Sequence, residues 1–263
     1  MSLILVSGAG SGIGAATTKA LVQAGFAVVA TDLRPPEPTL PEIVCWPAPL
    51  DVTDPVAVQR EVAAIEERLG PITGLVNAAG ILGKMHTPDR IRLENWNREL
   101  AVDLTGTFLM CREVGLHMTR RGRGSIVNVA SIAGMTSVPA HAYGAAKAGV
   151  IQLTATLATA WGRRGVRVNA VSPGFTRTPA LVAGLDAGAL DLVRLTGVAA
   201  LGRLVEPEEV GQAITWLIGP GSSAITGVNL PVDAGVLAAA GWPAYVNLEP
   251  PEPASTKLDD HDS

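Results

Sequence analysis

The sequence is poor in cysteine and histidine. Its 263 residues include two cysteines, Cys45 and Cys111, and four histidines, without a CxxC pair or a histidine-rich cluster. Structural zinc sites are built from such clusters, so we expect no metal site. We expect both cysteines to be small buried hydrophobic residues, in a protein of a reducing compartment, by default the cytoplasm.

An excess of positive charge and a long apolar run are also lacking. The formal net charge is −4, which argues against the basic surface that nucleic acid or an anionic membrane would require. No charge-free apolar window reaches the ~18 residues of a membrane span. The N-terminal run Leu3–Val6 is too short for a secretion signal and lacks a cationic start. We therefore expect neither a nucleic-acid nor a membrane partner.

What the sequence does contain is an alternation of short apolar runs and longer helical patterns. The apolar runs lack polar alternation, as strands buried on both faces of a parallel sheet do. The predicted strands are Leu3–Val6, Ala27–Thr31, Gly74–Asn77, Ser125–Val129, Arg167–Val171 and Gly227–Val232. The predicted helices are Gly14–Ala24, Pro55–Leu69 after the cap Asp54, Leu93–Thr119, Tyr143–Trp161 and Pro207–Ile218.

This alternation predicts an α/β protein with a single Rossmann-type, doubly wound parallel sheet and helices on both faces. The domain is expected to span residues 1–248. Residues 249–263 are rich in proline and then in acidic residues, which is typical of a flexible tail. The segment Pro179–Leu201, rich in small residues, is either a helical lid or a variable surface loop.

A glycine-rich loop joins the first strand to the first helix. It reads Ser7-Gly8-Ala9-Gly10-Ser11-Gly12-Ile13-Gly14. A chain that turns sharply and approaches a pyrophosphate has no room for side chains, and the following helix N-terminus supplies N–H groups and a positive dipole. The loop therefore predicts a dinucleotide site.

An acidic residue follows the second strand. Asp32 lies 18 residues after Gly14, close to the spacing expected of a carboxylate that binds the adenosine ribose hydroxyls. This carboxylate would repel the 2′-phosphate of NADP, and Ser11 supplies no basic group to offset that repulsion. Arg34 stands two residues later, and we expect it to face solvent. The predicted cofactor is NAD, with NADP less favoured.

Tyr143 and Lys147 stand four residues apart in a helical pattern and so share a face. The ammonium group can then favour the phenolate form of Tyr143, which would exchange a proton with an alcohol near neutral pH. Ser131, twelve residues upstream and just after a strand, is placed to bind the substrate oxygen. We predict an acid/base site from these three side chains.

Taken together, these motifs resemble those of the short-chain dehydrogenase/reductase family over residues 1–235. Gly8, Gly12 and Gly14 match the family's G-xxx-G-x-G pattern, and Tyr143 and Lys147 match its YxxxK pair. Three further segments are similar to family motifs: Asp51-Val52, Asn77-Ala78-Ala79-Gly80, and Pro173-Gly174-Phe175-Thr176-Arg177-Thr178.

The resemblance implies a function and a set of roles. The chain would transfer a hydride between a nicotinamide and a secondary alcohol or ketone carbon, with Tyr143 as acid/base and Ser131 orienting the substrate. Lys147 would also bind the nicotinamide ribose. The cofactor-binding set would be Gly8, Ser11, Gly12, Ile13, Gly14, Asp32, Leu33, Asp51, Val52, Asn77, Ala78, Gly80, Tyr143, Lys147, Pro173, Gly174, Thr176 and Thr178.

Three departures from the family pattern are visible. Asp103 stands where the family usually has an asparagine that holds a water of the proton relay. The interval from Ser131 to Tyr143 is one residue shorter than expected, which the loop Gly134–His141 would absorb. Asp233-Ala234-Gly235 replaces the frequent Asp-Gly-Gly. An ionised Asp103 would offset part of the Lys147 field on Tyr143, a protonated one would mimic the amide, and one turned outward would be purely structural.

Other functions remain open on the sequence. The alternatives are a 3-oxoacyl-carrier-protein reductase, which Asp32 disfavours, a cyclic dihydrodiol or cyclic-alcohol dehydrogenase, and a non-catalytic dinucleotide-binding or scaffold protein. The segments expected around the substrate are mostly apolar, which favours a neutral, carbon-rich substrate; they are Ile81–Thr87, Ala133–Val138, Pro179–Leu201 and residues 238–246. For the aromatic stretch Gly241–Tyr245 we expect packing against the core or a second subunit.

The resemblance also implies assembly. The helices Leu93–Thr119 and Tyr143–Trp161 would pair across a two-fold axis, giving a homodimer or homotetramer.

Overall fold

The computed structural model describes residues 2–37 and 40–242. Within them, seven strands form one parallel sheet in the order β3-β2-β1-β4-β5-β6-β7. The strands are β1 (Leu3–Ser7), β2 (Ala27–Thr31), β3 (Ile43–Cys45), β4 (Ile72–Asn77), β5 (Gly124–Val129), β6 (Val166–Pro173) and β7 (Asn229–Val232). The predicted doubly wound parallel sheet is confirmed.

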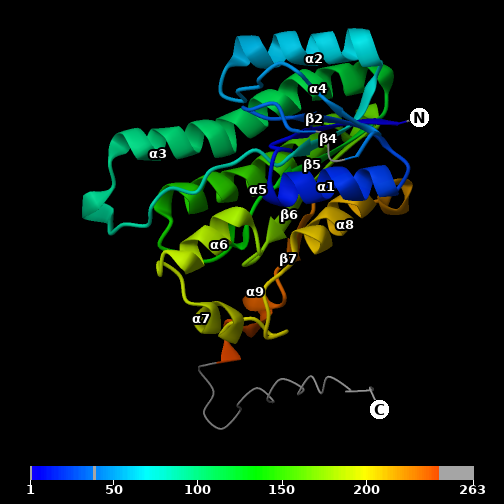
Figure 1. Cartoon of the computed structure of the whole chain (residues 1–263). Coiled ribbons are helices and arrows are strands. Elements are labelled where there is room, and N and C mark those ends of the chain that lie inside the picture. The colour runs from blue at the N-terminus through cyan, green and yellow to red at the C-terminus, as the bar shows by residue number, and fades with distance from the viewer. Residues whose placement is uncertain (1, 38–39, 243–263) are drawn as a thin grey trace, which may run out of the picture.

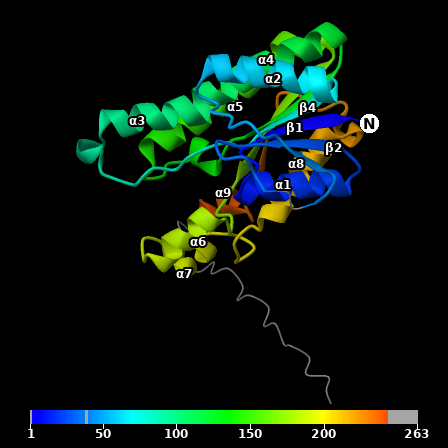
Figure 2. The same ribbon diagram turned by 45° about the horizontal axis from the view of Figure 1, so that its top comes forward.

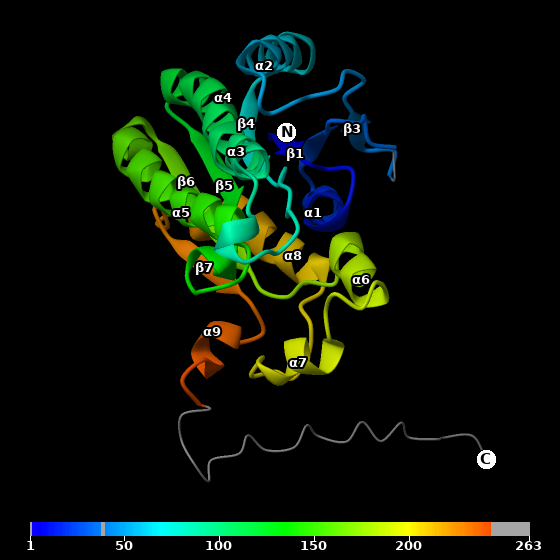
Figure 3. The ribbon, with the colours of Figure 1, turned by 90° about the vertical axis from the view of Figure 1, so that its left-hand side faces the viewer.

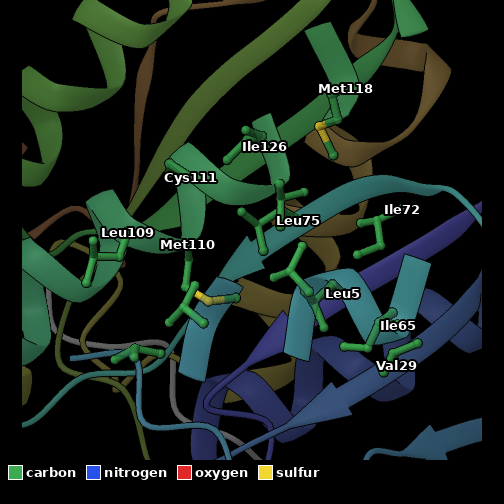
Figure 4. Packing of buried hydrophobic residues seen from close by; sticks show 14 of the residues in the cluster. Leu5, Val29, Ile65, Ile72, Leu75, Leu109, Met110, Cys111, Met118 and Ile126 are labelled. Atoms are coloured by element: carbon green, nitrogen blue, oxygen red, sulfur yellow. The ribbon is translucent and has the colours of Figure 1, made fainter. Parts of the chain in front are cut away.

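Helices cover both faces of the sheet, as Figures 1 and 3 show. One face carries α2 (Pro55–Leu69), α4 (Thr107–Arg121) and α5 (His141–Trp161), and the other carries α1 (Gly12–Gln23) and α8 (Pro207–Ile218). Figure 4 shows the first interface, where Met110 and Met118 of α4 and Ile65 of α2 meet Leu5 and Leu75 of the sheet. Because both faces are buried, the strands need no polar alternation.

The sheet order changes direction between β1 and β4. From β1 the chain proceeds through β2 to β3 on one side, and from β4 through β5 and β6 to β7 on the other. The loops that leave the carboxyl ends of β1 and β4 therefore diverge, and ligands of open α/β sheets bind in the crevice formed there.

The long predicted helix 93–119 is wrong as a single α-helix. It consists of α3 (Leu93–Leu100), a π-helical turn η2 (Ala101–Gly106) and α4. Apolar periodicity alone does not distinguish a π turn from α-helix, because the wide turn inserts one residue without breaking the hydrogen-bonded spiral.

Other differences are smaller. The edge strand β3 was not predicted, and Cys45 on it is half-buried rather than buried, whereas Cys111 on α4 is fully buried as predicted. The segment 179–201 contains two short helices, α6 (Pro179–Asp186) and α7 (Leu192–Gly197). Together with α9 (Val236–Ala239), they gather beyond the end of the sheet (Figure 2). Several predicted bounds shift by one or two residues; α5, for example, starts at His141.

No helix among the described residues is both long and apolar enough to cross a membrane. The predicted tail 249–263 and residues 243–245 of the aromatic stretch lie outside the described residues.

Candidate active site

The glycine loop lies at the carboxyl end of β1 and is packed too tightly for side chains. Gly8 has φ of +70°, and a Cβ there would overlap the backbone of Ala79. A Cβ on Gly14 would overlap the carbonyl oxygen of Gly8. The close approaches also bring two predicted motifs together, since Ala79 belongs to the segment Asn77–Gly80. Glycine is required here by sterics.

The first helix points its N-terminus at this loop. Ser11 precedes α1 in an extended conformation, with φ of −158° and ψ of 171°. Within the residues that the structure describes, the Ser11 side chain does not cap the helix, so the first-turn N–H groups remain available to an anion. Ile13 is partly buried against the core on the α1 side of the sheet and fixes the helix there.

Asp32 lies directly after β2 and faces the glycine loop. Its Oδ2 accepts a hydrogen bond of 2.9 Å from the Gly10 N–H, and its side chain remains partly accessible. Leu33 and Arg34 are exposed, as expected for Arg34. The Asp32 carbonyl accepts from the Leu50 N–H at 2.8 Å, which brings Asp51 and Val52 beside it. Asp32, Asp51 and Val52 therefore lie close together beyond the carboxyl end of β2.

The segment after β6 packs against the glycine loop at Gly12. Thr178 is the N-cap of α6, and its Cγ2 lies 3.3 Å from where a Gly12 Cβ would be. Thr176 is buried, with Oγ1 donating to the Gly174 carbonyl at 3.0 Å. Pro173 ends β6, so the whole predicted motif lies at the same edge of the sheet as the glycine loop.

The side chain of Asn77 lies between the sheet and the helices α4 and α5. Its Nδ2 donates to Asn128 Oδ1 of β5 at 2.9 Å and approaches the Cys111 sulfur at 3.2 Å, while Asn128 Nδ2 donates to Thr154 Oγ1 of α5. Burial raises the pKa of the Cys111 thiol to about 12, so this cysteine stays protonated. These side-chain hydrogen bonds connect β4 and β5 to α5.

Lys147 and Asp103 form a buried ion pair. Lys147 Nζ is 3.2 Å from Asp103 Oδ1, and their side chains are 5% and 0% exposed. The ammonium also donates to the Val129 carbonyl at 3.0 Å. The Ile81 N–H lies 3.3 and 3.4 Å from the two Asp103 oxygens. The outward-turned alternative for Asp103 is therefore wrong.

Two local features bring Asp103 to this position. It lies in the π-helical turn η2, whose wider spiral changes the direction of side chains relative to the flanking α-helices. Gly80 provides the space, because a Cβ there would lie 2.6 Å from Asp103 Oδ1 and 3.4 Å from Lys147 Nζ. Gly80 thus has a role that a cofactor-binding motif alone would not indicate.

Burial and the partners of Asp103 shift its pKa in opposite directions. Burial raises the pKa of Asp103 above the usual range of an aspartic acid, while Lys147 and the Ile81 N–H pull it back. The carboxyl is accordingly closer to protonation than an exposed aspartate.

Ser131 and Tyr143 complete the site. Ser131 follows β5, and its Oγ accepts from the Ala133 N–H at 3.1 Å. Tyr143 lies in the first turn of α5, half-buried, with its ring centroid 5.4 Å from Lys147 Nζ. A Cβ on Gly134 would lie 2.6 Å from the Ala148 nitrogen, so the short helix η3 (Ile132–Gly134) packs closely on α5.

Several residues of the site were not predicted. The Val129 carbonyl, Asn128, Thr154 and Gly134 hold Lys147 or α5 in place. Gly134, shortly after Ser131, offered a weak signal of close packing. A backbone carbonyl carries no sequence signal.

The arrangement fits a nicotinamide dinucleotide. The side-chain-free cradle at Gly8 and Gly14, the helix N-terminus at Ser11 and the carboxylate of Asp32 suit its pyrophosphate and adenosine ribose. In the described ranges, no group of three or more His, Cys, Asp or Glu side chains could hold a metal ion.

Comparison with known proteins agrees with this geometry. Residues 8–237 match the family described as "Enoyl-(Acyl carrier protein) reductase". Cis-4-hydroxycyclohexanecarboxylate dehydrogenase of Sinomonas cyclohexanicum is 38% identical over 89% of this chain and 96% of its own length.

Solved structures give the same picture. A Brucella melitensis 16M protein described as a ribose-5-phosphate isomerase is 44% identical, with a TM-score of 0.87 over 93% of this chain and 95% of its own. A single-residue variant of actinorhodin polyketide ketoreductase, solved with NADPH, is 33% identical, with a TM-score of 0.82 over 89% of this chain and 97% of its own. The chain belongs to the short-chain dehydrogenase/reductase family.

Proposed function

We propose that the protein is an NAD-dependent oxidoreductase that interconverts a secondary alcohol and a ketone. The observation that carries this proposal is the arrangement of Tyr143 over the buried Lys147–Asp103 pair, beside the glycine loop that ends near Asp32. In the oxidation, the alcohol carbon loses a hydride and its hydroxyl loses a proton. The dinucleotide, when bound, supplies the hydride acceptor.

The chain's own residues handle the proton and the orientation. Tyr143 removes the proton from the substrate hydroxyl in oxidation and returns it in reduction. Ser131 Oγ, held by the Ala133 N–H, orients the substrate oxygen. Lys147, fixed by Asp103 and the Val129 carbonyl, provides the positive field beside the phenol and a donor for the nicotinamide ribose.

Asp32 supports NAD over NADP. Its carboxylate faces the glycine loop, where it would accept bonds from the ribose hydroxyls and repel a 2′-phosphate. We expect kcat/KM for NAD to exceed that for NADP by about tenfold or more, since about 1.4 kcal/mol corresponds to each tenfold.

The experiment is turnover of a panel of secondary alcohols with both cofactors, with the reverse reaction on the matching ketones. Asp32→Ala should reduce the preference for NAD, whereas Asp89→Ala, an exposed aspartate on η1 (Pro88–Arg90), serves as the matched control. Equal turnover with both cofactors would overturn the NAD assignment. Dinucleotide binding without any hydride transfer would favour the non-catalytic alternative, and sugar-phosphate isomerisation without net NADH would favour an isomerase.

A homo-oligomer is part of the proposal. Phe108 and Leu116 of α4 are 39% and 41% exposed, large apolar side chains on a helix that the family resemblance assigns to a subunit interface. A two-fold contact would bury each patch twice. Light scattering at micromolar protein should report a dimer or tetramer, and a monomer would contradict this.

A further inference from the structure

A second feature of the site lies where two loops leave the sheet. A cavity of about 510 Å³ is lined by eight residues: Met85, His86, Thr87, Pro88, Ser137, Val138, Pro139 and His141. The first four belong to the loop between β4 and α3, and the others to the loop between β5 and α5 and the first residue of α5. It is an open depression at the surface, because all of its lining residues except the half-buried Val138 are exposed.

The cavity lies near the first turn of α5, which carries Tyr143. The loop after β4 also passes Asp103, because the Ile81 N–H, four residues before Met85, contacts its carboxyl group. On the other side, Val138 Cγ2 lies 3.8 Å from where a Cβ of Gly144 would be, next to Tyr143. His141 precedes Tyr143 by two residues on the same helix. A substrate bound at Tyr143 would have to extend around the first turn of α5 to reach this cavity.

The lining combines hydrogen-bond donors with an apolar wall. His86 and His141 each carry at least one ring N–H in any protonation state, and Thr87 and Ser137 add hydroxyl donors. The remaining residues, Met85, Pro88, Val138 and Pro139, are apolar. Such a set suits a carbon skeleton that ends in an acceptor-only group, which is what a carboxylate is.

The local charge also favours an anion. The eight described residues that line the cavity include no acidic side chain. Lys84 directly precedes the lining loop, and the nearby Asp89 is within 4.0 Å of Arg90. The segment beside the lining thus carries two cations, Lys84 and Arg90, and one acid, Asp89. This balance differs from the neutral substrate that the apolar segments predict.

We propose that this cavity binds the anionic end of the substrate through His86 and His141, so that the preferred substrate is a hydroxy acid rather than a neutral alcohol. The inference rests on the proposed function, because it names the class of substrate for the same site. The matched relative, whose name gives a hydroxycyclohexanecarboxylate, supplies the carbon skeleton for the probe.

The test compares two nearly isosteric substrates with NAD, cis-4-hydroxycyclohexanecarboxylate and its neutral carboxamide. The wild type should have at least a tenfold higher kcat/KM for the carboxylate. His86→Gln and His141→Gln should each raise KM for the carboxylate several-fold, and the double variant should abolish the preference while turnover of the carboxamide changes little. The matched control is His117→Gln, which replaces a histidine of α4 that lies beside Glu66 of α2, and it should behave as the wild type.

A second measurement does not depend on catalysis. Calorimetry of the enzyme saturated with NADH should detect binding of the unreactive cyclohexanecarboxylate, weakened at least tenfold in the double histidine variant and stronger than that of cyclohexanecarboxamide. Failure of hydride transfer with intact carboxylate binding would count against the proposed function alone. Equal affinity for acid and amide, or equal binding by wild type and double variant, would overturn the anionic subsite.

Discussion

The glycine loop after β1 and the segment 179–202 use glycine in opposite ways. In the loop, Cβ atoms at Gly8 and Gly14 would overlap backbone atoms of neighbouring segments. In the segment 179–202, Gly188, Gly197 and Gly202 have open space: in the described structure nothing lies within 4 Å of a Cβ at these positions. The described structure also gives α6 and α7 no buried residue, whereas α1 buries five.

The difference shows where the fold constrains the sequence. Where one backbone segment packs directly against another, only glycine fits. The glycine loop therefore has glycines at fixed positions, and these can be recognised in the sequence as a motif. In the described structure α6 and α7 bury no residue, so packing constrains the sequence of the segment 179–201 less. The largest effect is expected at Tyr143, the proposed acid/base residue.

Tyr143→Phe should produce the largest effect. Without the phenol hydroxyl, proton exchange with the substrate is lost, and kcat should fall by about 10²–10⁴-fold. The ring still packs beside Lys147, so the dissociation constant of NADH should change less than about threefold, measured by fluorescence. Retention of more than a tenth of wild-type kcat would remove Tyr143 from its proposed role.

The glycine contrast itself is tested by a matched pair of variants. Gly14→Ala forces its Cβ into the Gly8 carbonyl, and the resulting displacement of the loop should weaken dinucleotide binding by about 100-fold and destabilise the fold by about 1–3 kcal/mol. Gly197→Ala, at the end of α7, should leave both quantities within about 0.5 kcal/mol of wild type. Similar losses in the two variants would contradict the distinction between the glycine loop and the segment 179–202.

Asp103→Asn should have a moderate, pH-dependent effect. A carboxylate near Lys147 offsets part of its field at Tyr143, and removing that charge should let the phenolate form at lower pH. At about 6 Å and a dielectric near 20, one charge pair contributes roughly 3 kcal/mol, which sets an upper limit of about two pH units.

The readout is kcat/KM for alcohol oxidation against pH. We expect the basic limb to move toward lower pH in Asp103→Asn, with Glu99→Gln, one turn earlier on α3, as the comparison variant. Because burial raises the pKa of Asp103, a protonated carboxyl that mimics the amide is the competing account. Superimposable profiles for Asp103→Asn and wild type would support that account and reject ours.

Glu209→Gln should have the smallest effect, on stability. Arg203, just past the segment 179–201, pairs with Glu209 of α8 at 2.7 Å, and this contact, together with a hydrogen bond of 2.8 Å from the Glu206 N–H, lowers the pKa of Glu209 from 4.5 to about 2. A lowered folded-state pKa means that the stabilisation is present above pH 4.5 and is lost as the pH falls toward 2.

Both side chains are more than a third exposed, so we expect a loss of only up to about 1 kcal/mol in the free energy of unfolding at pH 7. The difference between Glu209→Gln and wild type should vanish near pH 2 in urea denaturation. A difference that persists at that pH would show that the ion pair is not its source.

The sequence predicts the doubly wound sheet and the strand–glycine loop–helix order well, but it does not predict the short strand β3 or which loop residues line the cavity. Three local patterns keep their predicted arrangement in the structure. The glycine loop joins β1 to α1, Asp32 contacts this loop, and Tyr143 and Lys147 lie side by side on α5. The strand β3 escapes prediction because it has only three residues after a proline-rich loop. The cavity brings together His86 and His141, which are 55 residues apart and belong to no common pattern.

The π-helical turn determines how α4 is oriented relative to α3. Successive residues of an α-helix are rotated by about 100°, so winding Ala101–Gly106 as regular α-helix without removing its extra residue would rotate α4 by about that angle relative to α3. Met110, Val114 and Met118 would then leave the sheet, or Asp103 would leave Lys147. At this chain length a regular spiral is incompatible with the observed core, so the packing of α4 maintains the irregular geometry on which the Asp103–Lys147 contact depends.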